Sequence, residues 1–102
     1  MLLSRQTRVR LDALFAPTDR EVASSLVAEY CAESLSWPGG GTPESLERVR
    51  FGVLKLSEGE LDRLLDAIQL ALTDWRDLLV AADFANDVEA HLAWWPGKDQ
   101  TS

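Results

Sequence analysis

The stretch that decides the fold is SEGELDRLLDAIQLALTDWRDLLVAA, which spans residues 57–82. Ser57 followed by Glu60 has the spacing of a capping box, and it predicts that a helix begins there. Thr73 predicts a second helix start, so we expect a helical hairpin that forms half of a core; a bent continuous helix is the alternative. Apolar residues of the first helix recur at helical spacing: Leu61, Leu64, Leu65, Ile68 and Leu72.

The rest of the chain is divided by similar signals. Pro17 ends a first element, and Thr18 with Glu21 repeats the capping-box spacing. Proline and three glycines end the next helix, so residues 37–42 are expected to be a flexible connector. Pro43 then suits the first position of a new helix. The sequence predicts an all-α fold, a single small bundle of four to five short helices near residues 4–15, 19–36, 43–56, 58–72 and 74–95, with a break at 84–86 left open.

Residues 4–15 fit two patterns. Leu11, Leu14 and Phe15 share one side of a helix, whereas Val9, Leu11, Ala13 and Phe15 alternate as in a strand. We expect a helix, because a lone strand would have no partner in an otherwise helical chain.

Length and composition indicate one domain over residues 1–102, with frayed ends at 1–3 and 97–102. The single cysteine, Cys31, cannot form an internal disulfide, and we expect it to fill an apolar position. No apolar run approaches the roughly 20 residues of a membrane span, and the first residues do not resemble a signal peptide. These features predict a cytoplasmic protein.

Charge is distributed unevenly along the chain. The formal net charge is −7, yet residues 1–10 contain Arg5, Arg8 and Arg10 and no acid. The acidic remainder would repel phosphate backbones, which argues against nucleic-acid binding, and would favour a basic partner surface. The alternative is an acidic surface that serves only solubility. Whether the basic N-terminal arm docks on this acidic body or on another molecule stays open.

Catalytic and metal-binding patterns are missing from the sequence. A metal site needs several converging ligands, but the chain has one histidine, His91, and one cysteine, Cys31, far apart in sequence. The pair Asp62 and Asp66 is ordinary for the solvated side of an acidic helix. We therefore predict no catalytic, cofactor-binding or metal-binding residues.

Apolar residues outside the main helical stripes are the candidates for an interaction surface. Phe51 and Leu54 lie off the stripe of residues 43–56, so that helix is either central to the core or in contact with a second subunit. Trp94 and Trp95 diverge by about 100°, and we expect Trp94 to remain partly exposed. The expected contact residues are Phe51, Leu54, Leu70 and Trp94. By contrast, we expect Trp75 in the core and Arg50, inside an apolar stripe, in a buried ion pair or with a snorkelling stem.

The segments TPESLERVRFGVLKLS, from Thr42, and TDWRDLLVAADFANDVEAH, from Thr73, resemble a set of small bacterial proteins to which no activity is attached. The resemblance covers about half of the chain. It implies glycine where this chain has Asp83, at the end of a helix where a residue tolerant of left-handed geometry is common.

Two functions fit these observations. The first is a non-enzymatic protein-interaction module: an acidic adaptor, an inhibitor or a homodimer-forming protein, binding neither nucleic acid nor membrane. The second is a small enzyme or ligand-binding domain with a pocket between helices near Cys31 and His91. Salt-sensitive binding to a protein would favour the first, and a small molecule that raises the melting temperature would favour the second.

Overall fold

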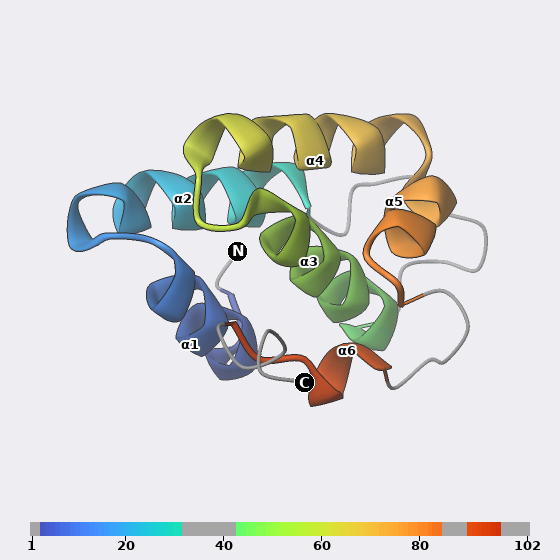
Figure 1. Cartoon of the computed structure of the whole chain (residues 1–102), viewed down its shortest axis with the longest axis horizontal. Coiled ribbons are helices and arrows are strands. Elements are labelled where there is room, and N and C mark those ends of the chain that lie inside the picture. The colour runs from blue at the N-terminus through green and yellow to red at the C-terminus, as the bar shows by residue number, and fades with distance from the viewer. Residues whose placement is uncertain (1–2, 32–42, 85–89, 97–102) are drawn as a thin grey trace.

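The computed structural model describes residues 3–31, 43–84 and 90–96. The regular structure in these residues is entirely helical, which confirms the predicted all-α bundle and makes residues 5–14 a helix rather than a strand (Figure 1). The expected connector at 37–42, the terminal residues 97–102 and the expected break at 84–86, except for Phe84, lie outside the described residues. The helices are α1 (Arg5–Leu14), α2 (Pro17–Tyr30), α3 (Pro43–Ser57), α4 (Leu61–Thr73), α5 (Trp75–Ala81) and α6 (Ala90–Ala93).

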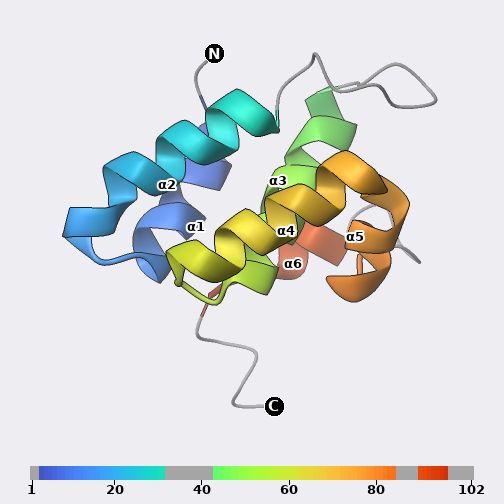
Figure 2. The same ribbon diagram turned by 90° about the horizontal axis from the view of Figure 1, so that it is seen from above.

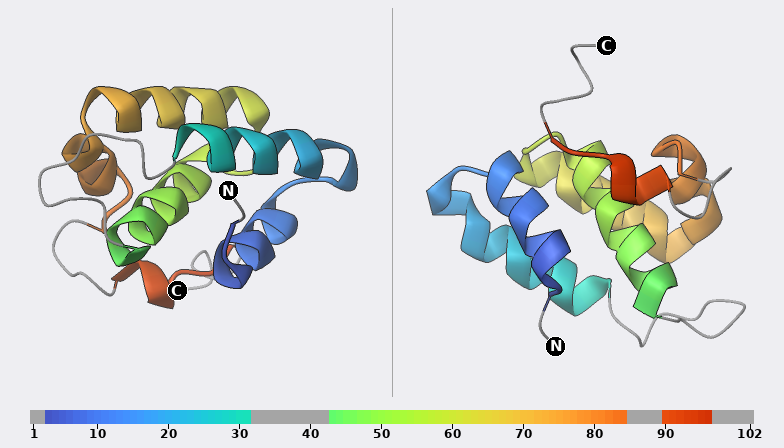
Figure 3. Two further views of the ribbon diagram at one scale, coloured as in Figure 1. Left: turned by 180° about the vertical axis from the view of Figure 1, so that it is seen from behind. Right: turned by 90° about the horizontal axis from the view of Figure 1, so that it is seen from below.

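Helix α3 is the centre of the bundle. It packs against α1, α4, α5 and α6, and α2 joins the bundle through α1 and α4. Figures 2 and 3 show the other helices arranged around α3 from above, behind and below. Apolar residues on more than one side of α3 are therefore buried. This position decides between the two explanations left open by the sequence: α3 is a central helix of its own subunit.

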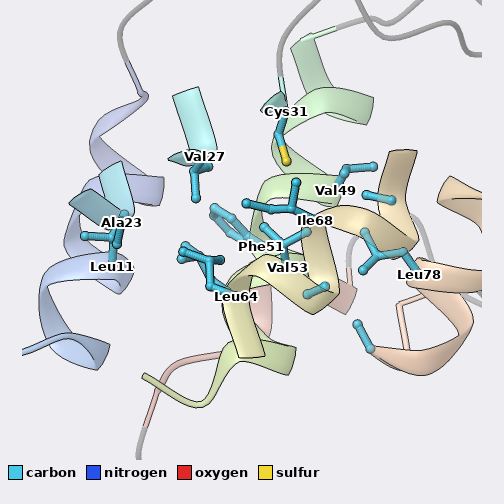
Figure 4. Packing of buried hydrophobic residues seen from close by; sticks show 14 of the residues in the cluster. Leu11, Ala23, Val27, Cys31, Val49, Phe51, Val53, Leu64, Ile68 and Leu78 are labelled. Atoms are coloured by element: carbon cyan, nitrogen blue, oxygen red, sulfur yellow. The ribbon is translucent and has the colours of Figure 1, made fainter. Parts of the chain in front are cut away.

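The core is formed where α3 meets α4, with α2 closing one side and α5 the other (Figure 4). Leu64 and Ile68 of α4 lie against Val53 of α3, as their helical spacing predicts. Gly52 is close to Leu78 of α5: a β-carbon at Gly52 would lie 3.3 Å from Leu78 Cδ2. Small size at Gly52 thus allows α3 and α5 to pack closely.

The helix starts differ from the capping positions expected from the sequence. Ser57 is the last residue of α3, where its hydroxyl donates to Leu54 O at 2.6 Å, and Glu60 is the N-cap residue of α4. Thr73 ends α4, and Asp74 caps α5 by accepting from the amides of the next turn. Asp74 has extended backbone geometry, so α4 and α5 are two separate helices, as in the expected hairpin, and not one bent helix.

Helix α2 also begins two residues earlier than expected. Pro17 occupies the first turn and Ala16 is the N-cap residue, without a side-chain hydrogen bond. Thr18, the expected cap, therefore lies inside the helix. Proline fits this position because the first amides of a helix have no intrahelical acceptor.

Helix α5 ends in a left-handed turn at Asp83, which has φ +66°. The amide of Phe84 donates to Leu79 O at 2.8 Å, and the amide of Asp83 donates to Val80 O at 3.1 Å. These two bonds define a Schellman motif, with Asp83 in the position that glycine usually occupies. Asp83 thus adopts the left-handed geometry although it is not a glycine.

The turn between α3 and α4 rests against the end of α1. Gly59 has φ +82°, and a β-carbon there would lie 2.5 Å from Leu14 O. Both its backbone angle and its surroundings require glycine. This contact fixes the positions of helices α3 and α4 relative to α1.

Candidate interaction surface

Three of the four expected contact residues are in the core. Phe51 and Leu54 have no exposed surface, and Trp94 is only 8% exposed. The assignment of these three residues to a contact surface is therefore wrong for this fold, because α3 has neighbours on several sides and α6 folds back over it. Leu70 is half-buried and lines a shallow hollow with Leu56.

The expected roles of two tryptophans are reversed. Trp94 packs against the rings of Phe51 and Phe84, with centroids 6.3 Å away in each case. Trp75, expected in the core, is partly exposed at the edge of the core. The guanidinium of Arg76 lies over its ring at 5.5 Å. The reason is position: Trp75 opens α5 at the rim of the bundle, whereas Trp94 follows α6 into the space beside α3.

Cys31 and His91 are both buried, but in different surroundings. Burial raises the pKa of the Cys31 thiol to about 12, against the opposing effect of the nearby Arg50 charge. A thiol held neutral in this way is a poor nucleophile. His91 lies edge-on to Phe51 at 5.1 Å and to Phe84 at 6.1 Å. The hollows that the structure describes are lined by other residues, and no group of three metal-ligating side chains occurs in the described ranges.

Arg10, one of the three arginines of the basic N-terminal arm, is part of the core. It is 1% exposed, and its guanidinium lies between the rings of Phe51 and Trp95, at 4.3 and 4.0 Å. Nε donates to Trp94 O at 2.9 Å, and Nη2 donates to Leu92 O at 3.1 Å, so Arg10 binds the C-terminal end of α6. Burial lowers the pKa of Arg10 while Glu47 raises it, and an arginine remains charged at neutral pH.

Four further basic side chains also bind carbonyl groups at helix C-termini. Arg20 donates to Phe15 O at the end of α1, and Arg50 donates to Cys31 O at the end of α2. At the end of α5, Arg48 donates to Phe84 O and Lys55 donates to Ala82 O. Cations are favourable there because unpaired carbonyls carry the negative end of the helix dipole. Together with Arg10, five basic side chains therefore bind carbonyl groups at helix C-termini: Arg10, Arg20, Arg48, Arg50 and Lys55.

Acidic side chains, in contrast to these basic side chains, stay at the surface. None of the acidic residues whose burial the structure describes is buried. Half of the ten basic residues point to backbone carbonyls, and Arg63 is paired with Glu58 at 3.0 Å. The charge that this part of the chain presents to water is therefore mainly negative.

Two neighbouring helices expose rows of apolar side chains, which we call the α2–α4 face. Two large apolar side chains of each helix are more than 40% exposed, and Leu26 and Leu61 are half-buried. A shallow hollow along α2 is lined by Leu26 together with Glu21 and Glu29. The exposed members are Val22 (49%) and Tyr30 (42%) on α2, and Leu65 (47%) and Leu72 (44%) on α4.

The two rows lie on the facing sides of the two helices. Helices α2 and α4 run side by side in the same direction along the top of Figure 1, and Figure 2 shows both from above. Val27 and Leu64 both point into the core below them (Figure 4). Leu65 follows Leu64 by about 100° around a right-handed helix, which turns it toward α2. Leu26 precedes Val27 by the same angle, which turns it toward α4.

The α2–α4 face was missed because its residues belong to stripes that the sequence assigns to the core. On α4, the stripe from Leu61 to Leu72 is wider than the side of the helix that the bundle covers. Leu64 and Ile68 occupy its buried centre, and Leu65 is at its edge. A stripe this wide was the signal that could have identified the surface.

No protein-family model, curated protein or solved structure matches the chain. None of the described helices combines the length and apolar character of a membrane span; α3 has 15 residues.

Proposed function

We propose that this protein is a non-enzymatic interaction module that binds a partner protein through the α2–α4 face. The observation that carries the proposal is the group of large apolar side chains exposed together on two adjacent helices. Exposed apolar residues that occur singly are normal, whereas a contiguous apolar patch with a polar rim is typical of interaction sites. The buried state of Cys31 gives no comparable support to an enzyme.

The rim of the α2–α4 face favours a different protein over a second copy. Glu21 and Glu29 line the hollow along α2 together with Leu26, and α4 exposes Asp62 and Asp66. In a symmetric dimer through this face, equivalent acidic rims would approach each other, which is unfavourable. A partner with lysine or arginine around an apolar centre would instead be attracted, so the module would act as an acidic adaptor or inhibitor. A cytoplasmic location is part of the proposal, because Cys31 is a free thiol.

The proposal can be tested by quantitative co-purification from the source cell at several salt concentrations. The bait proteins are the wild type, a Tyr30→Ala/Leu65→Ala double variant and Val80→Ala. Val80 is the matched control, because it is 65% exposed on α5 and lies outside the α2–α4 face. We expect one stoichiometric protein that is retained by the wild type and Val80→Ala, lost from the double variant and weakened by salt.

Equal retention by all three baits, or a partner bound only by way of α5, would contradict the proposal. Circular dichroism on each bait provides the folding control. Alanine is a good helix former, so replacing the two exposed side chains should leave the fold intact.

A further inference from the structure

We infer that the α2–α4 face takes up a basic amphipathic helix of the partner, laid over the groove between α2 and α4. The inference rests on the proposed function and names the partner's chemistry. Its three supports are the shape of the surface, the hydrogen-bonding groups available there and the charges at its rim.

The shape comes from two helices that run side by side in the same direction (Figure 2). Val22, Leu26 and Tyr30 are four residues apart, so they form one ridge along α2. Leu61 and Leu65 have the same spacing on α4. The groove between two such ridges matches the side chains of a third helix, which meet it at positions i, i+4 and i+7.

The hydrogen-bonding groups favour a helix over an extended strand. An extended peptide binds best by adding to a sheet edge, and the described part of the chain contains no strand. Backbone groups of α2 and α4 are used within their own helices. A helical partner satisfies its backbone internally, so it can bury apolar side chains in the groove without leaving polar groups unpaired.

The rim charges favour lysine and arginine on the partner. Asp19, Glu21 and Glu29 lie on α2, and Asp62 and Asp66 lie on α4. The basic residues of these two helices are already engaged: Arg20 donates to the carbonyls of Phe15 and Asp12, and Arg63 pairs with Glu58 and Glu60. The rim is thus left with acidic groups that a basic helix would complement.

The test uses synthetic peptides of about 14 residues, a length at which a helix is marginal alone and can be stabilised by binding. The probe has leucine at i, i+4, i+7 and i+11 and lysine on its other positions. One control replaces lysine by glutamate, and another keeps the composition but scatters the leucines around the helix. Binding is measured by fluorescence anisotropy at about 50 and about 300 mM salt, which changes the screening of surface charges.

We expect only the probe to bind, with increased helicity and with weaker affinity at high salt. Leu65→Ala and Tyr30→Ala should each weaken binding by about tenfold, while Val80→Ala should bind as the wild type does. A Glu21→Lys/Glu29→Lys variant should shift the preference from the probe toward the glutamate peptide. The inference is overturned if the scattered peptide binds equally well, or if the α2–α4 face variants bind the probe as strongly as Val80→Ala does.

The same variants separate the two proposals. If no peptide binds but co-purification of the partner is lost with Tyr30→Ala/Leu65→Ala, the face is an interaction site and the helical occupant is wrong. If co-purification is also unaffected, the proposed function itself fails.

Discussion

Replacing Arg10 should destabilise the bundle more than replacing any other basic residue near the N-terminus. Its guanidinium is enclosed between two aromatic rings and bonded to two carbonyl groups at the end of α6. Arg10 therefore joins α1 to the end of α6. The informative change is Arg10→Met, because methionine retains much of the volume and removes every donor.

The size of the effect follows from the groups left behind. Without Arg10, the buried carbonyl of Trp94 loses its donor, which costs about 1–3 kcal/mol. The carbonyl of Leu92 is nearer to water and contributes less, and loss of the stacked cation adds about 0.5–2 kcal/mol. Methionine avoids the cost of burying a charge, which offsets part of the sum. We expect a net loss of about 2–4 kcal/mol, a large share of the roughly 5–15 kcal/mol typical of a domain.

Urea unfolding followed by tryptophan fluorescence and far-ultraviolet circular dichroism measures this loss. Arg8→Met is the matched control, since Arg8 is exposed on the same helix and should change stability by less than about 0.5 kcal/mol. Arg10→Lys should lie between the two, because one ammonium cannot reproduce the planar fork of the guanidinium. If Arg10→Met matches the wild type within about 0.5 kcal/mol, Arg10 does not stabilise the end of α6.

Four other measurements follow from single positions. Asp83→Gly should raise the free energy of unfolding by about 0.5–1 kcal/mol, because glycine adopts the left-handed turn without strain; an unchanged or lower value in urea unfolding would contradict the Schellman geometry. Gly59→Ala should lower it by more than about 1 kcal/mol, because the new methyl group would meet Leu14 O, and neutral behaviour would contradict that contact. Trp94→Ala should cost about 3–5 kcal/mol in the same assay, as expected for a buried aromatic residue, and a surface-like loss below about 1 kcal/mol would refute its burial. The raised pKa of Cys31 keeps the folded thiol protonated while the unfolded thiol ionises above about pH 9, so stability should fall above that pH by up to about 1.4 kcal/mol per unit. Cys31→Ala should show a smaller fall, and equal slopes would refute the linkage.

The all-α class and the approximate helix positions could be predicted from periodicity and from proline and glycine, but the caps could not, and the helix expected over residues 74–95 is present as two helices, α5 and α6. Ser57 has the right spacing for a cap with Glu60. The left-handed turn at Gly59, however, brings the connection between α3 and α4 against Leu14. Helix α3 therefore continues to Ser57, and α4 starts later. The spacing of Ser57 and Glu60 describes a helix start that this segment could form alone. The contact of Gly59 with α1 determines where the turn between α3 and α4 lies.

The interaction surface could not be predicted from residues that lie off a helical stripe. The expectation that off-stripe residues are exposed assumes a helix with one buried side, which holds for α4 and fails for α3. Phe51 and Leu54 are off the stripe of α3 because that helix is buried on several sides. On α4, Leu65 lies within the apolar stripe but beyond the limit of the core. Exposure depends on where neighbouring helices end, and that is a property of the assembled bundle.

The formal net charge understates how acidic the outer surface is. Arg50 of α3 binds the end of α2 and Arg10 of α1 binds the end of α6, and both side chains are buried. Arg20, Arg48 and Lys55 are likewise directed at backbone carbonyls. Each replaces, at a helix C-terminus, the solvation that water would otherwise give. Since these cations serve the fold, the acidic residues are less balanced at the surface than a sum over the sequence suggests. The charges that face water are the ones that a partner meets, and on the α2–α4 face those charges favour a basic helix.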